Sequence, residues 1–245
     1  MSGHSKWSTI KRKKGLKDAQ KGQIFTKLSR LITLAVLEGG GMTDPGINVK
    51  LRLAVEKAKS ANMPKDTVQR AIEKGHGPDK DSLKEVMYEG FAPDGIALLI
   101  QVTTDNNNRT IAEIRGVLDR GGGKLGSQGS VSYLFQKCGV VTFDKSTNSE
   151  DAIFEFGDAV QSLDIEEDDS SLTVYFPFEN LGKVQELLNG LVPSSPAEVN
   201  YRPFTEIKIE DEKKAKRIVD LVGRLEDLDD VQSVFGNFEI PDTFF

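Results

Sequence analysis

The chain has 245 residues, of which 38% are hydrophobic and 29% charged, and its formal net charge is −6 at pH 7. That length suits two or three modest domains, and this composition is typical of a globular protein rather than a disordered or fibrous one. We expect neither a membrane span nor a secretory signal, because no apolar run approaches the ~18 residues that a span requires. A single cysteine, Cys138, excludes an intrachain disulfide and favours a reducing, cytoplasmic location.

The charge is divided unevenly along the chain. Residues 1–80 carry 17 basic and 7 acidic residues, a net charge of +10, whereas residues 81–245 carry 15 basic and 31 acidic residues, a net charge of −16. A basic segment favours a polyanion as partner, and an acidic segment restricts where that polyanion can lie. The alternative is that the asymmetry serves only solubility.

The basic segment begins with residues 1–20, which show no sustained apolar period and predict an arm. Three helices follow, each with hydrophobic residues at helical spacing, and together they predict a small bundle over residues 22–75. The first helix should end at the glycines 39–41. We expect Asp44 to cap the second helix, with Pro45 at its first position, and Pro64 to open the third.

After residue 78 the pattern changes to short strands alternating with helices. The predicted strands cover residues 85–91, 96–104, 130–136, 139–144, two segments within 164–177, 197–203, 204–210 and 231–240. The predicted helices cover residues 108–123, 150–163, 179–191 and 211–228. We expect Asn108 to cap the first of these helices.

The order of these elements predicts the fold class, α+β, and three domains. Residues 1–79 form the basic arm and the helical domain. Residues 137–203 have the order β-α-β-β-α-β of a ferredoxin-like domain. We expect this domain to be inserted into a discontinuous α/β domain made of residues 80–136 and 204–245, because the two flanking pieces resemble halves of one unit.

The sequence offers little catalytic chemistry. Two histidines, His4 and His76, and one cysteine provide neither a metal cluster nor a credible Ser-His-Asp triad. Residues 121–126 match G-x-G-x-x-G, but they follow a predicted helix and precede a strand, which is the wrong context for a dinucleotide loop. The acidic residues 164–169 lack the ligand spacing of a calcium loop and indicate a solvated turn. We therefore expect no enzyme activity, no cofactor, no metal and no small-molecule substrate.

Basic residues of the arm and the bundle are the candidates for contact with nucleic acid, because point charges neutralise phosphates and release counterions. The alternatives are that the lysine run is a solvated tail, that Trp7 pins the arm to the protein instead of stacking on a base, and that Arg109 serves only the capping loop at residues 104–110. The candidate residues are Lys6, Trp7, Lys11, Arg12, Lys13, Lys14, Lys21, Lys27, Arg30, Lys50, Arg52, Lys65, Arg70 and Arg109.

Long motifs along nearly the whole chain resemble the YebC/PmpR family. They are MSGHSKWSTIKRKK, DAQKGQIFTKL, NMPKDTVQRAIEKG, YEGFAPDGIALLI, TDNNNRTIAEIR, GGKLGSQGSVSYLF and LEDLDDVQSVFGN. The resemblance implies a three-domain cytoplasmic protein without catalytic residues. Bacterial members are commonly called probable transcriptional regulatory proteins, and mitochondrial relatives are translational activators of a cytochrome oxidase subunit.

The sequence thus predicts a non-enzymatic, nucleic-acid-binding regulator of gene expression, first of all a DNA-binding transcriptional regulator. One alternative is a translation factor that associates with the ribosome or ribosomal RNA, since the same lysines can contact an RNA backbone. A third reading is a protein-interaction module in which a partner docks on the acidic domains. No membrane association is expected.

Overall fold

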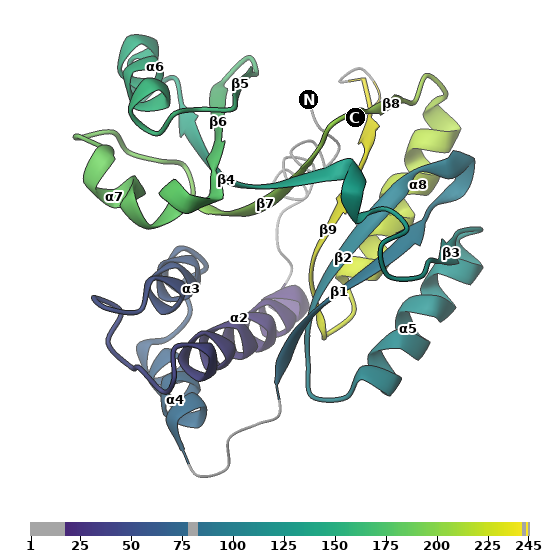
Figure 1. The fold of residues 1–245 in the computed structure, drawn as a ribbon, viewed down its shortest axis with the longest axis horizontal. Coiled ribbons are helices and arrows are strands. Elements are labelled where there is room, and N and C mark those ends of the chain that lie inside the picture. The colour runs from purple at the N-terminus through teal and green to yellow at the C-terminus, as the bar shows by residue number, and fades with distance from the viewer. Residues whose placement is uncertain (1–17, 78–82, 242–243, 245) are drawn as a thin grey trace.

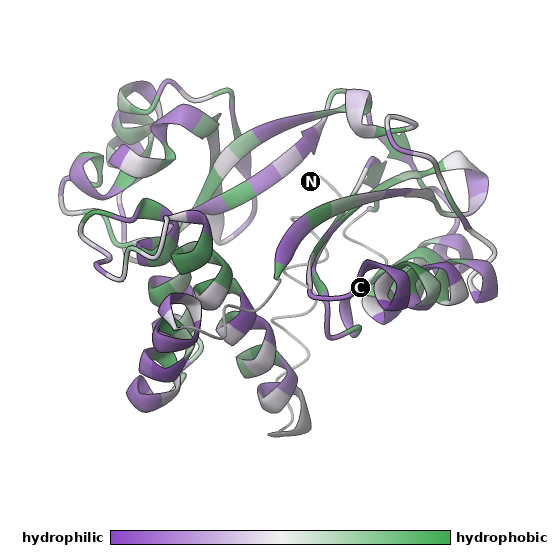
Figure 2. Ribbon diagram, turned by 60° about the horizontal axis from the view of Figure 1, so that its bottom comes forward, coloured by the Kyte–Doolittle hydropathy of each residue, from purple (hydrophilic) through white to green (hydrophobic). Residues whose placement is uncertain are grey.

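The computed structural model describes residues 18–77, 83–241 and 244, with side chains from residue 21 onward. Its elements form three groups around a central junction (Figure 1). The helical domain comprises α2 (Asp18–Glu38), α3 (Val49–Ser60) and α4 (Lys65–His76). Helices at the periphery carry both hydrophobic and hydrophilic residues, as amphipathic helices do (Figure 2).

The helical domain packs α2 against both other helices. Its core contains Leu28, Ile32, Leu51 and further apolar residues that recur every three or four positions. Helix α4 crosses α2 closely at Gly75, where a Cβ atom would lie 2.7 Å from both the Thr33 carbonyl oxygen and the Val36 Cβ. Only a glycine permits this approach, so the crossing depends on that position.

The prediction that Asp44 caps the second helix was wrong. Helix α3 begins at Val49, and Asn48 is its N-cap: the Asn48 Oδ1 atom accepts a hydrogen bond from the Leu51 amide at 3.0 Å. Asp44 instead accepts the Gly46 amide at 2.8 Å within the preceding turn. Aspartate serves either role, and here the local turn competes successfully with the helix start.

The flanking unit is a four-stranded sheet with two helices on one face (Figure 1). Its strand order is β3-β1-β2-β9, and all its strand pairs are antiparallel. Leu98, Ile100 and Val102 of β2 face the core beneath the two helices. The strands are β1 (Lys84–Phe91), β2 (Ala97–Thr104), β3 (Lys124–Leu125) and β9 (Val231–Gly236), and the helices are α5 (Asn107–Arg120) and α8 (Glu212–Glu226). A parallel pair joins β8 (Ile207–Lys208) to β10 (Phe238–Glu239).

The inserted unit lies between β3 and β8 in the chain and forms a second antiparallel sheet. Its strand order, β5-β6-β4-β7, places the first strand of the unit beside the third and the fourth, as in a ferredoxin-like plait. Its elements are β4 (Phe135–Asp144), α6 (Glu150–Ala159), β5 (Asp164–Glu167), β6 (Ser171–Pro177), α7 (Val184–Leu187) and β7 (Glu198–Pro203). The predicted α+β class with a helical bundle and two small mixed units is confirmed.

A buried carboxylate explains why residues 130–134 are not the predicted strand. Glu89, 5% exposed, accepts backbone amides of Gly129 at 2.7 Å, Val131 at 2.5 Å and Ser132 at 2.9 Å. These amides therefore cannot join a sheet ladder, and a short 3-10 turn over Ser132–Leu134 precedes β4. Burial by itself would raise the pKa of Glu89, but the three backbone hydrogen bonds outweigh it and lower that pKa.

Two other predicted boundaries differ from the structure. The helix predicted over residues 179–191 is a 3-10 segment, Phe178–Lys183, followed by the single turn α7. The cap of α5 is Asn106, whose Oδ1 atom accepts the Arg109 amide at 3.1 Å, and not the predicted Asn108. The glycine run at 121–123 ends α5, with Gly121 as its C-cap.

The strands β4 and β7 connect the two α/β units (Figure 1). Phe135 of β4 packs with Leu99 and Phe235 on the face of the flanking sheet that the helices leave open. Tyr201 of β7 contacts Phe235, with ring centroids 5.1 Å apart. Because the inserted unit is held at this open face, a cleft forms where it, the flanking sheet and α2 meet.

Candidate nucleic-acid interface

The strongest sequence candidates belong to the arm. Lys6, Trp7, Lys11, Arg12, Lys13 and Lys14 lie outside the described residues, so their role stays a prediction. The remaining candidates divide into those that face outward and those that bind other parts of the protein.

The outward-facing candidates lie mainly on α4. Lys65 and Arg70 are exposed, and so is Lys59 in the last turn of α3, which the sequence analysis did not single out. Within the part of the chain that the structure describes, these three side chains make no hydrogen bond or ion pair. They are therefore available to phosphates. Lys21 is exposed but engaged, and Lys50 pairs with Glu38 at 2.6 Å on the surface.

Three candidates on the helical domain bind the other two units instead of facing solvent. The Lys27 Nζ donates to the Glu226 carbonyl oxygen, and Arg30 donates to the Asp230 carboxylate and, at 3.3 Å, to the Asp229 carbonyl oxygen. Arg52 donates to the Gly182 carbonyl oxygen of the inserted unit at 3.1 Å. These cations hold the helical domain in place, and their contacts compete with any role in phosphate binding.

The contacts of Arg30 end on a buried carboxylate. Asp230 is 2% exposed and lies in the turn between α8 and β9. Its Oδ2 atom accepts hydrogen bonds from Thr110 Oγ1 at 2.5 Å, Arg109 Nη2 at 3.0 Å and Thr104 Oγ1 at 3.1 Å, while Oδ1 accepts Arg30. Every side of the carboxylate is thus occupied by a donor.

The environment keeps Asp230 ionised. Burial by itself would raise its pKa, but the hydrogen bonds from Thr110, Arg109 and Arg30 outweigh burial and lower the pKa to about 2. Arg109 pairs with Asp105 of the capping loop at 2.8 Å, but its contact with Asp230 at 3.0 Å shows that it does not serve this loop alone. Sequence inspection could not find Asp230, since its partners come from two segments that lie more than 100 residues earlier in the chain.

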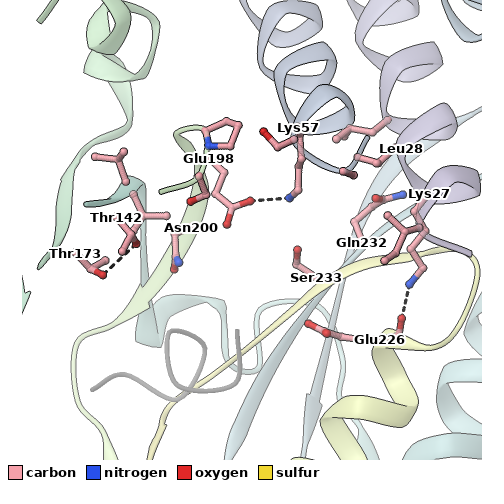
Figure 3. Close-up of a pocket in the computed structure, with 18 of the residues that line it drawn as sticks. Lys27, Leu28, Lys57, Thr142, Thr173, Glu198, Asn200, Glu226, Gln232 and Ser233 are labelled. Atoms are coloured by element: carbon pink, nitrogen blue, oxygen red, sulfur yellow. Dashed lines mark hydrogen bonds and ion pairs between the residues drawn. The ribbon is translucent and has the colours of Figure 1, made fainter. Parts of the chain in front are cut away.

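A cavity of about 410 Å³ lies at the junction of the three parts (Figure 3). A neighbouring cavity of about 430 Å³ shares six of its lining residues, so the two form one cleft. Lys57 of α3 crosses the cleft to Glu198 of β7 at 2.6 Å, and the charge of Glu198 raises the pKa of Lys57. The shared lining residues are Leu31, Lys57, Pro196, Glu198, Gln232 and Ser233.

Two further groups of titratable residues in the described part of the chain are candidates for a reactive centre, Cys138 and the acidic cluster at residues 164–169. Burial raises the pKa of Cys138 to about 11, so its thiol is protonated at neutral pH. Across the described ranges, no group of three or more His, Cys, Asp or Glu side chains is placed to hold a metal ion. The acidic cluster is partly paired, since Arg202 contacts both Asp164 and Glu166.

Comparisons with known proteins agree over nearly the whole chain. The model of the TACO1/YebC N-terminal domain matches residues 5–78, and the model of the TACO1/YebC second and third domain matches residues 83–238. Among the described helices, none is long and apolar enough to cross a membrane.

Curated relatives share both sequence and length with this chain. A "probable transcriptional regulatory protein" of Syntrophus aciditrophicus is 46% identical over 99% of this chain and 97% of its own, and one of Aquifex aeolicus is 42% identical with the same coverage. The crystal structure of a conserved hypothetical protein from Aquifex aeolicus is 39% identical, covers 92% of this chain and 93% of its own, and superposes with a TM-score of 0.83. The chain therefore belongs to the TACO1/YebC family.

Proposed function

We propose that this protein is a non-enzymatic regulator of transcription that binds DNA through the phosphate backbone. The observation that carries the proposal is that Lys59, Lys65 and Arg70 are exposed and have no partner among the described residues. They belong to a domain of net positive charge in a chain that is otherwise acidic. The relatives' printed name, probable transcriptional regulatory protein, supports regulation as the role.

The pattern on α4 favours contact with the backbone rather than with base edges. Asp66 and Glu73 alternate with Lys65 and Arg70 along its exposed surface, so this helix does not present a uniformly basic face to a groove. Base recognition needs side chains that reach donor and acceptor groups within a groove, whereas backbone contact needs only correctly placed cations. Binding should therefore depend strongly on salt and weakly on base sequence.

Backbone contact alone also fits the second candidate, a translation factor that binds ribosomal RNA. The alternation of acidic and basic residues on α4 favours this second candidate as well. Three separate cations can contact the phosphates of an RNA backbone, because their spacing does not require the geometry of B-form DNA. The arm would supply further contacts in either case.

Competition binding separates the two functions. Purified protein is measured against duplex DNA, structured ribosomal RNA and intact ribosomes at 50 and 200 mM salt. Binding to duplex DNA at 50 mM salt that falls steeply by 200 mM, with no binding to ribosomes at either salt concentration, supports the DNA-binding regulator. Binding that persists only on ribosomes supports the translation factor.

Charge variants test the location of the contact. Replacing Lys11, Arg12, Lys13 and Lys14 by alanine should abolish most polyanion binding at moderate salt, and Lys59→Ala with Lys65→Ala and Arg70→Ala should lower the salt slope by about 0.9 per lost contact. A matched control removes three exposed cations from the flanking unit, Lys208, Lys213 and Arg217. Equal losses for the two triple variants, or unchanged binding of the arm variant, would contradict the proposal.

A further inference from the structure

The central cleft contains a local irregularity of the flanking sheet. Strand β9 pairs with β2 in a regular register from Gly236 to Ser233, but the next pair joins Val231 to Val102. Gln232 is therefore an extra residue, which makes this position a β-bulge. Bulges redirect side chains, and they occur more often than expected beside binding sites.

The bulge brings two consecutive side chains to one cavity. On a regular strand, neighbouring side chains point to opposite faces, yet Gln232 and Ser233 both line the cleft (Figure 3). The Gln232 Nε2 atom is buried and has no hydrogen-bond partner among the described residues. A buried amide donor without a partner costs free energy, and this one thus points to a group that binds there.

The lining of the cavity indicates what kind of group that is. Its four charged residues are balanced, since Lys27 and Lys57 lie with Glu226 and Glu198, and Lys57 and Glu198 already form an ion pair. An ionised ligand would therefore meet an opposing charge. Ile24, Leu28 and Leu31 of α2 provide an apolar part of its wall. The site suits a neutral ligand with apolar faces and an edge that both donates and accepts hydrogen bonds.

We propose that the cleft binds one unstacked nucleobase of a bound nucleic acid, with the Gln232 amide pairing to its edge. A base is flat and uncharged, and a side-chain amide can form two adjacent hydrogen bonds with it. A cavity of about 410 Å³ falls within the usual range of small-ligand sites, roughly 300–1,000 Å³. This inference rests on the proposed function, because the phosphates of the same strand would be held by the basic arm and the outer cations.

Nucleosides test the site without any phosphate contact. Adenosine, cytidine, guanosine and uridine are titrated separately into the full-length protein by calorimetry. We expect at least one to bind, and we expect Gln232→Leu to weaken that binding about 10–30-fold, as the loss of two hydrogen bonds should. The control Gln128→Leu alters an exposed glutamine outside the cleft and should leave binding unchanged. A second variant, Thr142→Phe, fills the cavity from β4 and should also abolish binding.

Two outcomes separate this inference from the proposed function. The alanine variant of Lys11–Lys14 should lose oligonucleotide binding but retain nucleoside binding, whereas Gln232→Leu should lose nucleoside binding and retain the salt slope of oligonucleotide binding. Thermal unfolding of each variant verifies that it folds. Failure of all four nucleosides to bind at millimolar concentration, or equal binding by the wild type and a folded Gln232→Leu, would overturn the inference while leaving the arm result intact.

Discussion

At the scale of single residues, Asp230 connects segments that lie far apart in the chain. It joins Arg30 of the helical domain to Arg109, Thr104 and Thr110 of the flanking unit. Removing the charge of a buried carboxylate that is fully hydrogen-bonded leaves the opposing cations unpaired. This lowers the free energy of unfolding much more than the loss of a surface ion pair does.

We expect Asp230→Asn to lower the free energy of unfolding by about 2–4 kcal/mol, because the neutral amide cannot accept from all four donors. Urea denaturation measures this loss. The matched control is Asp229→Asn, which removes the same charge from an exposed neighbour and should change stability by no more than about 0.5 kcal/mol. Equal effects of the two substitutions would show that the contacts of Asp230 do not stabilise the fold.

The low pKa of Asp230 also predicts a pH dependence. Its folded-state pKa of about 2 lies below the ordinary value of 3.8, so the ionised carboxylate contributes about 2 kcal/mol that is fully present above pH ~4. This contribution is lost as the pH falls through 2. The stability difference between wild type and Asp230→Asn should therefore shrink between pH 5 and pH 2, as unfolding curves at several pH values would show. A constant difference would mean that the carboxylate is not selectively stabilised when ionised.

At the scale of elements, Asn48 shows how a helix start depends on more than its own turn. Besides accepting the Leu51 amide, Asn48 donates to the carbonyl oxygens of Ala35 at 2.8 Å and Met42 at 3.2 Å. It therefore caps α3 and ties it to the end of α2. Asp44, which the sequence favoured, makes only a local turn.

Asn48→Ala should destabilise the helical domain by about 1–3 kcal/mol, since a cap and two partly buried hydrogen bonds are lost together. Asp44→Ala, which removes one exposed turn contact, is the comparison and should cost less than about 1 kcal/mol. Thermal unfolding followed by circular dichroism ranks the two. A larger loss of stability in Asp44→Ala than in Asn48→Ala would indicate that Asp44 is the functional cap.

At the scale of the whole molecule, cations of the helical domain set the arrangement of the three parts. Arg30 attaches this domain to the flanking unit, and Arg52 attaches it to the inserted unit. We expect the shape of the cleft described above to depend on both attachments.

Arg30→Ala combined with Arg52→Ala should loosen these attachments and increase the radius of gyration in small-angle X-ray scattering. The control, Lys65→Ala with Arg70→Ala, removes the same charge from positions without described partners and should leave the radius unchanged. If the control increased the radius as much, repulsion among charges rather than specific contacts would govern the arrangement.

Much of this protein was determined by its sequence alone. The periodicity of apolar residues indicated the helical bundle and the order of strands and helices, because that signal arises within a few turns or residues. The prediction of a strand over residues 130–136 was wrong at the start of that segment. Backbone amides there donate to Glu89, which lies some forty residues earlier in the chain, so the local pattern could not indicate this. The division into a basic first third and an acidic remainder of the chain could also be counted directly from the sequence.

The tertiary structure alone decided which cations remain free. In sequence, Arg30 and Arg70 are equivalent basic residues on amphipathic helices, but Arg30 meets Asp230, 200 residues away, whereas Arg70 meets solvent. The same holds for Gln232, whose extra place in β9 appears only when the pairing with β2 is known. The local sequence pattern predicts on which face of a helix or strand a side chain lies. Only the packing of distant segments determines which residues that face contacts.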